Sequence, residues 1–203
     1  AGCRTINRRW RHVDGALTPK EGAMAIIDKM TAAERLVQSA VDMLDRKDDP
    51  LAVHVVASSA LSLLRELVAA EGDDYVAQVL KDAVFRAAQA KLQGAPTGMP
   101  EAKEIDAIVD TVVAGIEAGA VQSPADIIIT TPNKEVRAWL DYIFKPYNFL
   151  KHADRDPLAT RDEADFDPEG ALEHAITAYL MAHGDGKLPE PFRAYLQKRG
   201  ILV

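Results

Sequence analysis

The sequence has few of the residues that stabilise secreted proteins or anchor proteins in membranes. It contains one cysteine, Cys3, in 203 residues, so an internal disulfide is excluded. It shows no uninterrupted apolar run near the roughly 20 residues that a membrane-spanning helix needs. We therefore expect a cytoplasmic protein with no membrane partner.

Several sequence motifs of common enzyme classes are also absent. There is no G-x-x-x-x-G-K loop, no G-x-G-x-x-G turn and no G-x-S-x-G elbow, which excludes P-loop hydrolases, Rossmann dinucleotide binding and the usual serine hydrolases. No H-E-x-x-H spacing occurs, and the lone cysteine offers no thiolate cluster. We predict no cofactor and no metal, although a metal site built from His54, His152, Asp154 and Asp156 is conceivable.

The composition is that of a folded, acidic protein. Hydrophobic residues make up 48% of the chain and the formal net charge is −7. A chain of this length and composition can bury a full core. The negative charge argues against broad, non-specific coating of DNA, while a local basic patch stays open.

Residues 1–20 differ from the rest of the chain. Four arginines surround Trp10 there, namely Arg4, Arg8, Arg9 and Arg11. This stretch is either a basic arm that meets nucleic acid or an acidic partner, or an upstream extension. We expect a single helical domain over residues 21–203.

Apolar residues recur at helical spacing from residue 31 onward, and alternating strand patterns are missing. Predicted helices begin at Thr31, Asp49, Asp73 or Asp74, about Ile105, Thr131, Asp167 and Pro191. Thr31 and Glu34 have the spacing of a capping box, and aspartate before proline is a favourable start at residues 49 and 167. The fold class predicted is all-α, a helical bundle of about six to eight helices.

Two local features test this reading. Three isoleucines at 127–129 have the composition of a short strand, but no second strand is available, so a short helical turn is preferred. Pro146 lies inside the helical pattern that begins at Thr131 and is expected to kink or break that helix. The pattern then continues helically to about Ala153.

The stretch 147–157 holds an amide, an imidazole, two cations and two carboxylates within eleven residues. In a helix, Asn148 and His152 lie four residues apart and share a face, with Lys151 and Arg155 on the neighbouring face. Histidine transfers protons near neutral pH, and a cation beside it stabilises negative charge on a phosphoryl group. These residues suit metal-free cleavage of RNA, and they equally suit binding of a phosphate or a carboxylate.

This stretch resembles the motif of HEPN domains, small all-α proteins of which many are metal-independent ribonucleases and others are non-catalytic. The motif is an Arg, often followed by Asn, and a His after four to six further residues. His152 matches the His and Asn148 the polar residue, while Tyr147 stands where the Arg is expected. Lys151 or Arg155 is the candidate to supply the positive charge of the missing Arg. The run Asn-Phe-Leu-Lys-His-Ala-Asp-Arg-Asp-Pro also resembles a signature of uncharacterised bacterial proteins.

The resemblance implies catalytic roles for His152, Asn148 and Arg155, and RNA or a nucleotide as partner. The ligand-binding candidates are Lys151, Tyr147, Asp154, His54 and Arg65. It also implies a homodimer, for which Trp139, Tyr142 and Phe144 offer apolar side chains. A non-catalytic interaction or regulatory protein, in which the stretch 147–157 is structural, is the alternative.

Two further expectations concern histidines outside this stretch. His54 begins a polar strip with Ser58, Ser62 and Arg65. Either this strip faces His152 in one pocket, or His54 is a hydrogen-bonded histidine at the edge of its helix without a functional role. His174 and His183 have no partner at helical spacing and are expected on the surface.

Overall fold

The computed structural model describes residues 26–99, 103–128, 144–152, 156–184 and 186–201. Its described part consists of helices, turns and loops without strands. The helices are α1 (Lys29–Arg46), α2 (Pro50–Ala70), α3 (Tyr75–Leu92), α4 (Lys103–Glu117), α6 (Pro168–His183) and α7 (Glu190–Lys198), with two 3-10 turns, η1 (Pro124–Asp126) and η2 (Glu163–Asp165). Residues 144–151 are also helical and are called segment 144–151 below. The predicted all-α bundle is confirmed.

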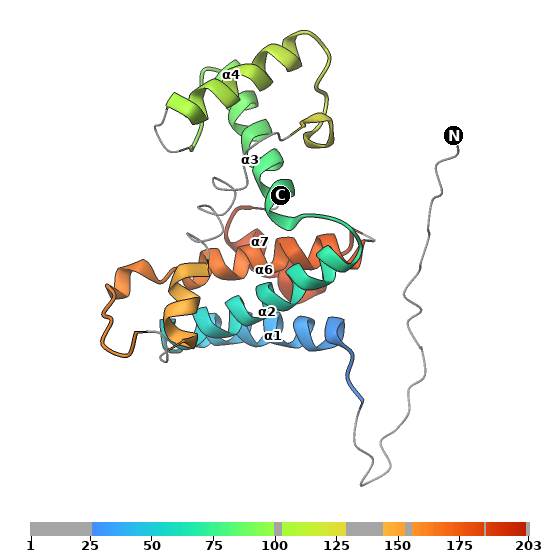
Figure 1. Ribbon diagram of the computed structural model, residues 1–203. Coiled ribbons are helices and arrows are strands. Elements are labelled where there is room, and N and C mark those ends of the chain that lie inside the picture. Colours follow the sequence, from blue (N-terminus) through green and yellow to red (C-terminus); the bar gives the residue numbers. More distant parts are fainter. Residues whose placement is uncertain (1–25, 100–102, 129–143, 153–155, 185, 202–203) are drawn as a thin grey trace.

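Helix α2 is the centre of the main bundle. It packs against α1 and against α6 (Figure 1). Its side chains Val53, Leu61 and Leu64 are fully buried, because they repeat at the spacing that keeps one helical face towards the core. Helix α7 closes the bundle with Phe192, which is also fully buried.

By length and composition alone, α2 is apolar enough to cross a membrane. The expectation drawn from uninterrupted apolar runs did not foresee this, because polar residues such as His54 and Arg65 interrupt the apolar ones. The core helix of a bundle meets the same criteria of length and composition, and α2 packs between two other helices. Burial in the bundle therefore accounts for its apolar composition.

Helices α2, α3 and α6 begin at predicted caps. Asp49 accepts hydrogen bonds from the backbone N–H of Leu51 and Ala52 at 2.9 and 3.2 Å. Asp74, the second of the two predicted alternatives, caps α3. Asp167 caps α6, which ends at Gly184 in a left-handed conformation with φ of 69°. Such a conformation favours glycine because it has no Cβ.

The predicted start of the first helix at Thr31 is wrong by two residues. Helix α1 begins at Lys29, and Asp28 caps it by accepting from the backbone N–H of Thr31 at 2.7 Å and from its hydroxyl at 3.1 Å. Glu34 has a different partner, since it accepts the hydroxyl of Tyr179 at 3.1 Å. Asp is at least as good an N-cap as Thr, and the helix begins after the earlier of the two residues.

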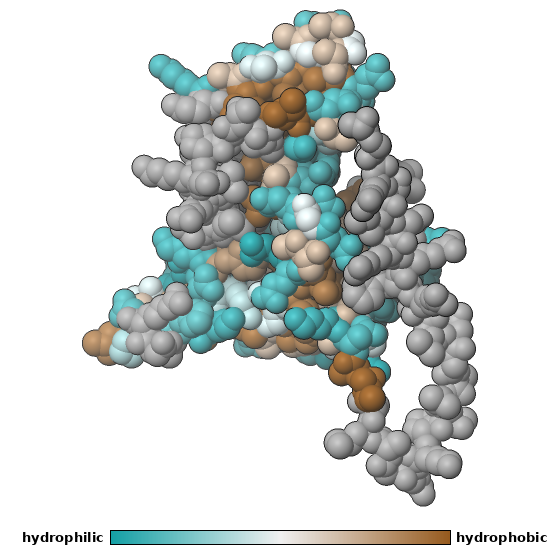
Figure 2. Space-filling model, turned by 45° about the vertical axis from the view of Figure 1, so that its right-hand side comes forward, coloured by the Kyte–Doolittle hydropathy of each residue, from teal (hydrophilic) through white to brown (hydrophobic). Residues whose placement is uncertain are grey.

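A second cluster of buried side chains lies apart from the main core. It joins the later part of α3, through Val84, Ala87 and Ala88, to α4 and to Ile127. Figure 1 shows α4 packed at the far end of α3, away from α1, α2 and α6. Hydrophobic residues gather on this part of the surface (Figure 2), where Ile108 is 43% exposed.

The short helical turn predicted at the three isoleucines, residues 127–129, is found instead at the residues just before them. Residues 124–126 form η1, whereas Ile127 is extended. The carboxylate of Asp126 accepts from the backbone N–H of Gln122 and Ser123 and from the Ser123 hydroxyl, which fixes the turn before the isoleucines. These hydrogen bonds lower the pKa of Asp126.

The helix predicted to begin at Thr131 is only partly described, because residues 129–143 lie outside the described ranges. Pro146 is within segment 144–151, and the chain is helical on both sides of it there. The predicted helical continuation past Pro146 is confirmed as far as Lys151.

Candidate functional site

Segment 144–151 is attached to α2 through two aromatic side chains. Phe144 and Tyr147 are buried at 8% and 9% exposure. The guanidinium carbon of Arg65 lies 4.5 Å from the ring centroid of Phe144, and the Tyr147 hydroxyl lies 3.3 Å from the Ser59 hydroxyl. Part of the predicted polar strip on α2 therefore faces this segment, and Arg65 contacts an aromatic ring in it.

The C-terminal turn of the segment presents polar side chains. Asn148 and Lys151 are exposed, and His152 is half-buried. The backbone N–H of His152 donates to the carbonyl of Asn148 at 3.0 Å, so the helix runs to its end at these residues. The Lys151 ammonium lies 5.4 Å from the Tyr147 ring centroid, a distance at which a cation is attracted to the ring face.

The segment thus positions an amide, an ammonium and an imidazole at one helix terminus. Because the carbonyl end of a helix carries partial negative charge, Lys151 is also favourably placed for the helix itself. Two predicted site residues, Asp154 and Arg155, lie outside the described residues, and Asp156 beyond them is exposed.

His54 is a core residue. It is 3% exposed, and its Nδ1 lies 3.2 Å from the Asp167 carbonyl. A carbonyl only accepts, so Nδ1 carries the proton and Nε2 holds the lone pair. Nε2 is buried and has no hydrogen-bond partner among the described residues, and burial lowers the pKa of His54.

An aromatic chain links His54 to the candidate site. Its ring packs edge-on against Phe166 at 5.6 Å between centroids, and Phe166 lies 6.1 Å from Phe149. His54 therefore supports the segment through packing. The imidazole itself is enclosed and does not offer a free face to solvent.

The prediction that His174 and His183 lie on the surface is wrong. Both are half-buried. The ring of His183 stacks on Tyr179 with 5.4 Å between centroids, and Nδ1 of His174 lies 2.8 Å from the hydroxyl of Tyr75. Burial lowers the pKa of His174 and raises that of Tyr75.

Sequence reasoning missed the pair of Tyr75 and His174 because the two residues are 99 positions apart. The only available signal was a tyrosine directly after the Asp74 cap, which puts an aromatic residue at the start of α3. Helical spacing compares neighbours within one helix and gives no information on partners in another.

No metal centre is found in the part of the chain that the structure describes: no three His, Cys, Asp or Glu side chains come together there. The conceivable set of His54, His152, Asp154 and Asp156 is not supported at His54, whose Nδ1 is bonded to a carbonyl in the core.

Comparison of the chain with protein-family models, with curated proteins and with solved structures found no match. The site is therefore interpreted from its own chemistry.

Proposed function

We propose that the protein is a HEPN-like helical module that binds RNA or a nucleotide at the C-terminal end of segment 144–151. The observation that carries the proposal is the exposure of Asn148 and Lys151 beside the half-buried His152 on a segment anchored by Phe144 and Tyr147. Anchored aromatic side chains hold the polar ones in place, which reduces the ordering cost of binding.

The chemistry of these groups fits a phosphate ester. The Lys151 ammonium supplies a positive charge and up to three donors, and the Asn148 amide supplies two donors and one acceptor. His152 supplies an imidazole, a group that can serve as a general base or a general acid. In the catalytic form of the proposal, His152 removes the proton of the ribose 2′-OH as that oxygen bonds to the neighbouring phosphorus. The bond from phosphorus to the 5′-oxygen breaks, the 5′-oxygen takes a proton from water, and a 2′,3′-cyclic phosphate is left.

The presence of Tyr147 in place of the motif's Arg is a reason to treat RNA binding and RNA cleavage as separate properties. The Tyr147 side chain is buried against α2 with its hydroxyl near Ser59. Among the described residues, Lys151 is therefore the cation closest in sequence to His152. Since Lys does not replace the planar, bidentate guanidinium, we propose binding as the common property and ribonuclease activity as the property to be tested separately.

The proposal includes a cytoplasmic homodimer, since HEPN domains often pair near their motifs. Trp139 and Tyr142 lie outside the described residues. Phe144 is buried in the chain's own core beside Arg65, so it is unavailable for a dimer contact.

The second candidate is a non-catalytic interaction protein, in which segment 144–151 has only a structural role. It is favoured by the burial of Phe144 and Tyr147 and by the packing of Phe149 on Phe166. It differs from the first candidate in requiring no ligand at Asn148, Lys151 and His152.

Binding of labelled single-stranded RNA, followed by fluorescence anisotropy at several salt concentrations, distinguishes the two. Lys151→Ala is expected to weaken binding and to lower the salt slope by about one, as for a lost phosphate contact. Lys145→Ala is the matched control, because Lys145 is an exposed lysine in the same segment at a different angle around the helix. Equal affinity of the Lys151 and Lys145 variants, or no saturable binding at all, contradicts the proposal.

Cleavage is measured on the same RNA in the presence of a chelator. The ribonuclease form predicts loss of product with His152→Ala and unchanged product with Lys145→Ala. Binding without cleavage by the wild-type protein would establish a binding module and remove the catalytic role of His152.

A further inference from the structure

A groove separate from segment 144–151 runs along α6. Its floor is one stripe of that helix, including Glu173, His174 and Thr177, and it encloses about 330 Å³. One wall is α3, and the other is formed by Leu188, Leu196 and Ile201. This volume is at the lower end of ligand sites, so the groove suits a small molecule.

His174 presents a hydrogen-bond acceptor to this groove. The Tyr75 hydroxyl donates to the His174 carbonyl at 3.1 Å, and the same hydroxyl lies 2.8 Å from Nδ1. Because the hydroxyl has a single proton and the carbonyl only accepts, both contacts are satisfied when Nδ1–H donates to the hydroxyl oxygen. The neutral ring then keeps its lone pair on Nε2, which has no partner in the described part of the chain.

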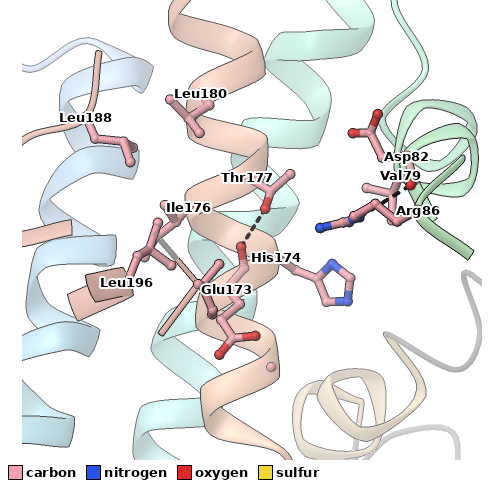
Figure 3. Close-up of a pocket in the computed structure, with 12 residues that line it drawn as sticks. Val79, Asp82, Arg86, Glu173, His174, Ile176, Thr177, Leu180, Leu188 and Leu196 are labelled. Carbon is pink, nitrogen blue, oxygen red and sulfur yellow. Dashed lines mark hydrogen bonds between the residues drawn. The ribbon is translucent and has the colours of Figure 1, made fainter. Parts of the chain in front are cut away.

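The α3 wall carries two opposite charges that do not neutralise each other. Arg86 and Asp82 are four residues apart, yet Nε of Arg86 donates to the backbone carbonyl of Asp82 at 3.3 Å, and the Asp82 carboxylate faces the amide of Gln78 at 3.5 Å. No carboxylate among the described residues pairs with the Arg86 guanidinium. Arg86 extends from α3 and His174 from α6 towards the same space (Figure 3).

The remaining charge in the groove is already paired. Glu173 accepts from Nε of Arg199 at 3.3 Å. The hydroxyl of Thr177 donates to the Glu173 carbonyl at 2.9 Å. The groups left for a ligand are therefore one guanidinium, one carboxylate and the Nε2 acceptor.

The wall opposite α3 is apolar. It contains Leu188, Leu196 and Ile201, and Ile176 and Leu180 of α6 adjoin it. Ile201 is 48% exposed. A ligand that covers these side chains removes apolar surface from water, which favours binding.

We propose that this groove binds a free apolar α-amino acid in its zwitterionic form. The ligand carboxylate pairs with Arg86, the ammonium donates to Asp82 and to Nε2 of His174, and the side chain packs against Leu188 and Leu196. Both charges of the α3 wall are then used, whereas a simple anion would face the Asp82 carboxylate and a simple cation would face the guanidinium. This proposal is independent of the proposed function at segment 144–151.

Isothermal titration calorimetry on the full chain tests the proposal with L-leucine and L-phenylalanine. Two matched probes lack one charge each: 4-methylpentanoic acid has no ammonium, and 3-methylbutylamine has no carboxylate. We expect saturable binding of at least one amino acid, with both single-charge probes weaker by about tenfold or more, since each loses a charge-assisted hydrogen bond.

Variants place the binding in this groove. Arg86→Ala is expected to weaken amino-acid binding about ten- to a hundredfold, while Arg35→Ala, which removes an exposed arginine on α1, leaves it unchanged. Tyr75→Phe removes the hydroxyl that accepts from Nδ1–H of His174, so the proton is no longer fixed on Nδ1. We expect this variant to bind the amino acid more weakly although no group that contacts the ligand is lost. The circular dichroism spectrum of each variant checks that its helices are retained.

The proposal is overturned if neither amino acid binds saturably up to about 10 mM. It is also overturned if 4-methylpentanoic acid binds as tightly as leucine, or if Arg86→Ala and Arg35→Ala behave alike.

Discussion

At the scale of single residues, His54 and His174 show why side-chain chemistry does not follow from sequence position. His54 and His174 were respectively a candidate ligand and an expected surface residue. The structure ties one to the Asp167 carbonyl and the other to Tyr75. Those partners come from distant stretches of the chain, so the sequence pattern around each histidine held no information about them.

Burial gives both histidines a defined effect on stability. Their pKa values are lowered from 6.5 in the folded protein. The unfolded chain therefore binds protons more readily, and stability is complete above about pH 6.5 and is lost as the pH falls towards the folded pKa values. At His54 a second proton would occupy Nε2, for which the described part of the chain offers no acceptor.

We expect the free energy of unfolding, measured with urea, to decrease between about pH 7.5 and about pH 5.5. His54→Asn retains a donor that can replace Nδ1–H and cannot be protonated in this range, so its decrease should be shallower. An identical pH dependence in the wild-type protein and this variant would contradict the assignment of His54.

At the scale of helices, local signals were sufficient wherever a single good cap was present. The caps at Asp49 and Asp167 were predicted because aspartate directly before proline is favourable at the start of a helix. The signal failed at α1, where Asp28 and Thr31 are both good caps and the apolar stripe does not distinguish them. The candidate site follows the same division: helical spacing predicted that Asn148 and His152 share one face, but the burial of Tyr147 depends on α2.

The two neighbouring aspartates before α3 provide a matched test of capping. Asp74 accepts from the backbone N–H of Val76 at 2.9 Å and of Ala77 at 3.2 Å. Asp74→Ala is expected to lower the free energy of unfolding by about 1 kcal/mol. Asp73→Ala removes the same charge from an exposed residue and is expected to change it by less than about 0.5 kcal/mol. Equal effects in thermal or urea unfolding would contradict the role of Asp74.

At the scale of the whole molecule, the described part contains two clusters of buried side chains that share α3. Tyr75 and Val76 belong to the main core, whereas Val84 belongs to the cluster around α4. The sequence predicted each helix but not this division, because an apolar stripe shows which face is buried and not against which neighbour.

A cavity-forming substitution is expected to destabilise the whole bundle when it lies in the main core, and only the α4 region when it lies in the second cluster. Leu64→Ala in the main core should lower the free energy of unfolding by about 2–5 kcal/mol. Val109→Ala, in the α4 cluster, should mainly accelerate hydrogen exchange in 103–117 and leave protection in α1 and α2 close to that of the wild-type protein. Hydrogen exchange with mass spectrometry measures both. Uniform acceleration across α1, α2 and α4 in the Val109 variant would indicate a single cooperative unit.

One consequence of the shared helix concerns movement. Helix α3 has 18 residues and is about 27 Å long, with its first turn held by the bond between Tyr75 and His174 and its far end carrying α4. If α3 tilted as a rigid rod about that bond, a change of about 10° would displace its far end by about 5 Å. Small rearrangements around Tyr75 would be amplified into visible displacements of α4.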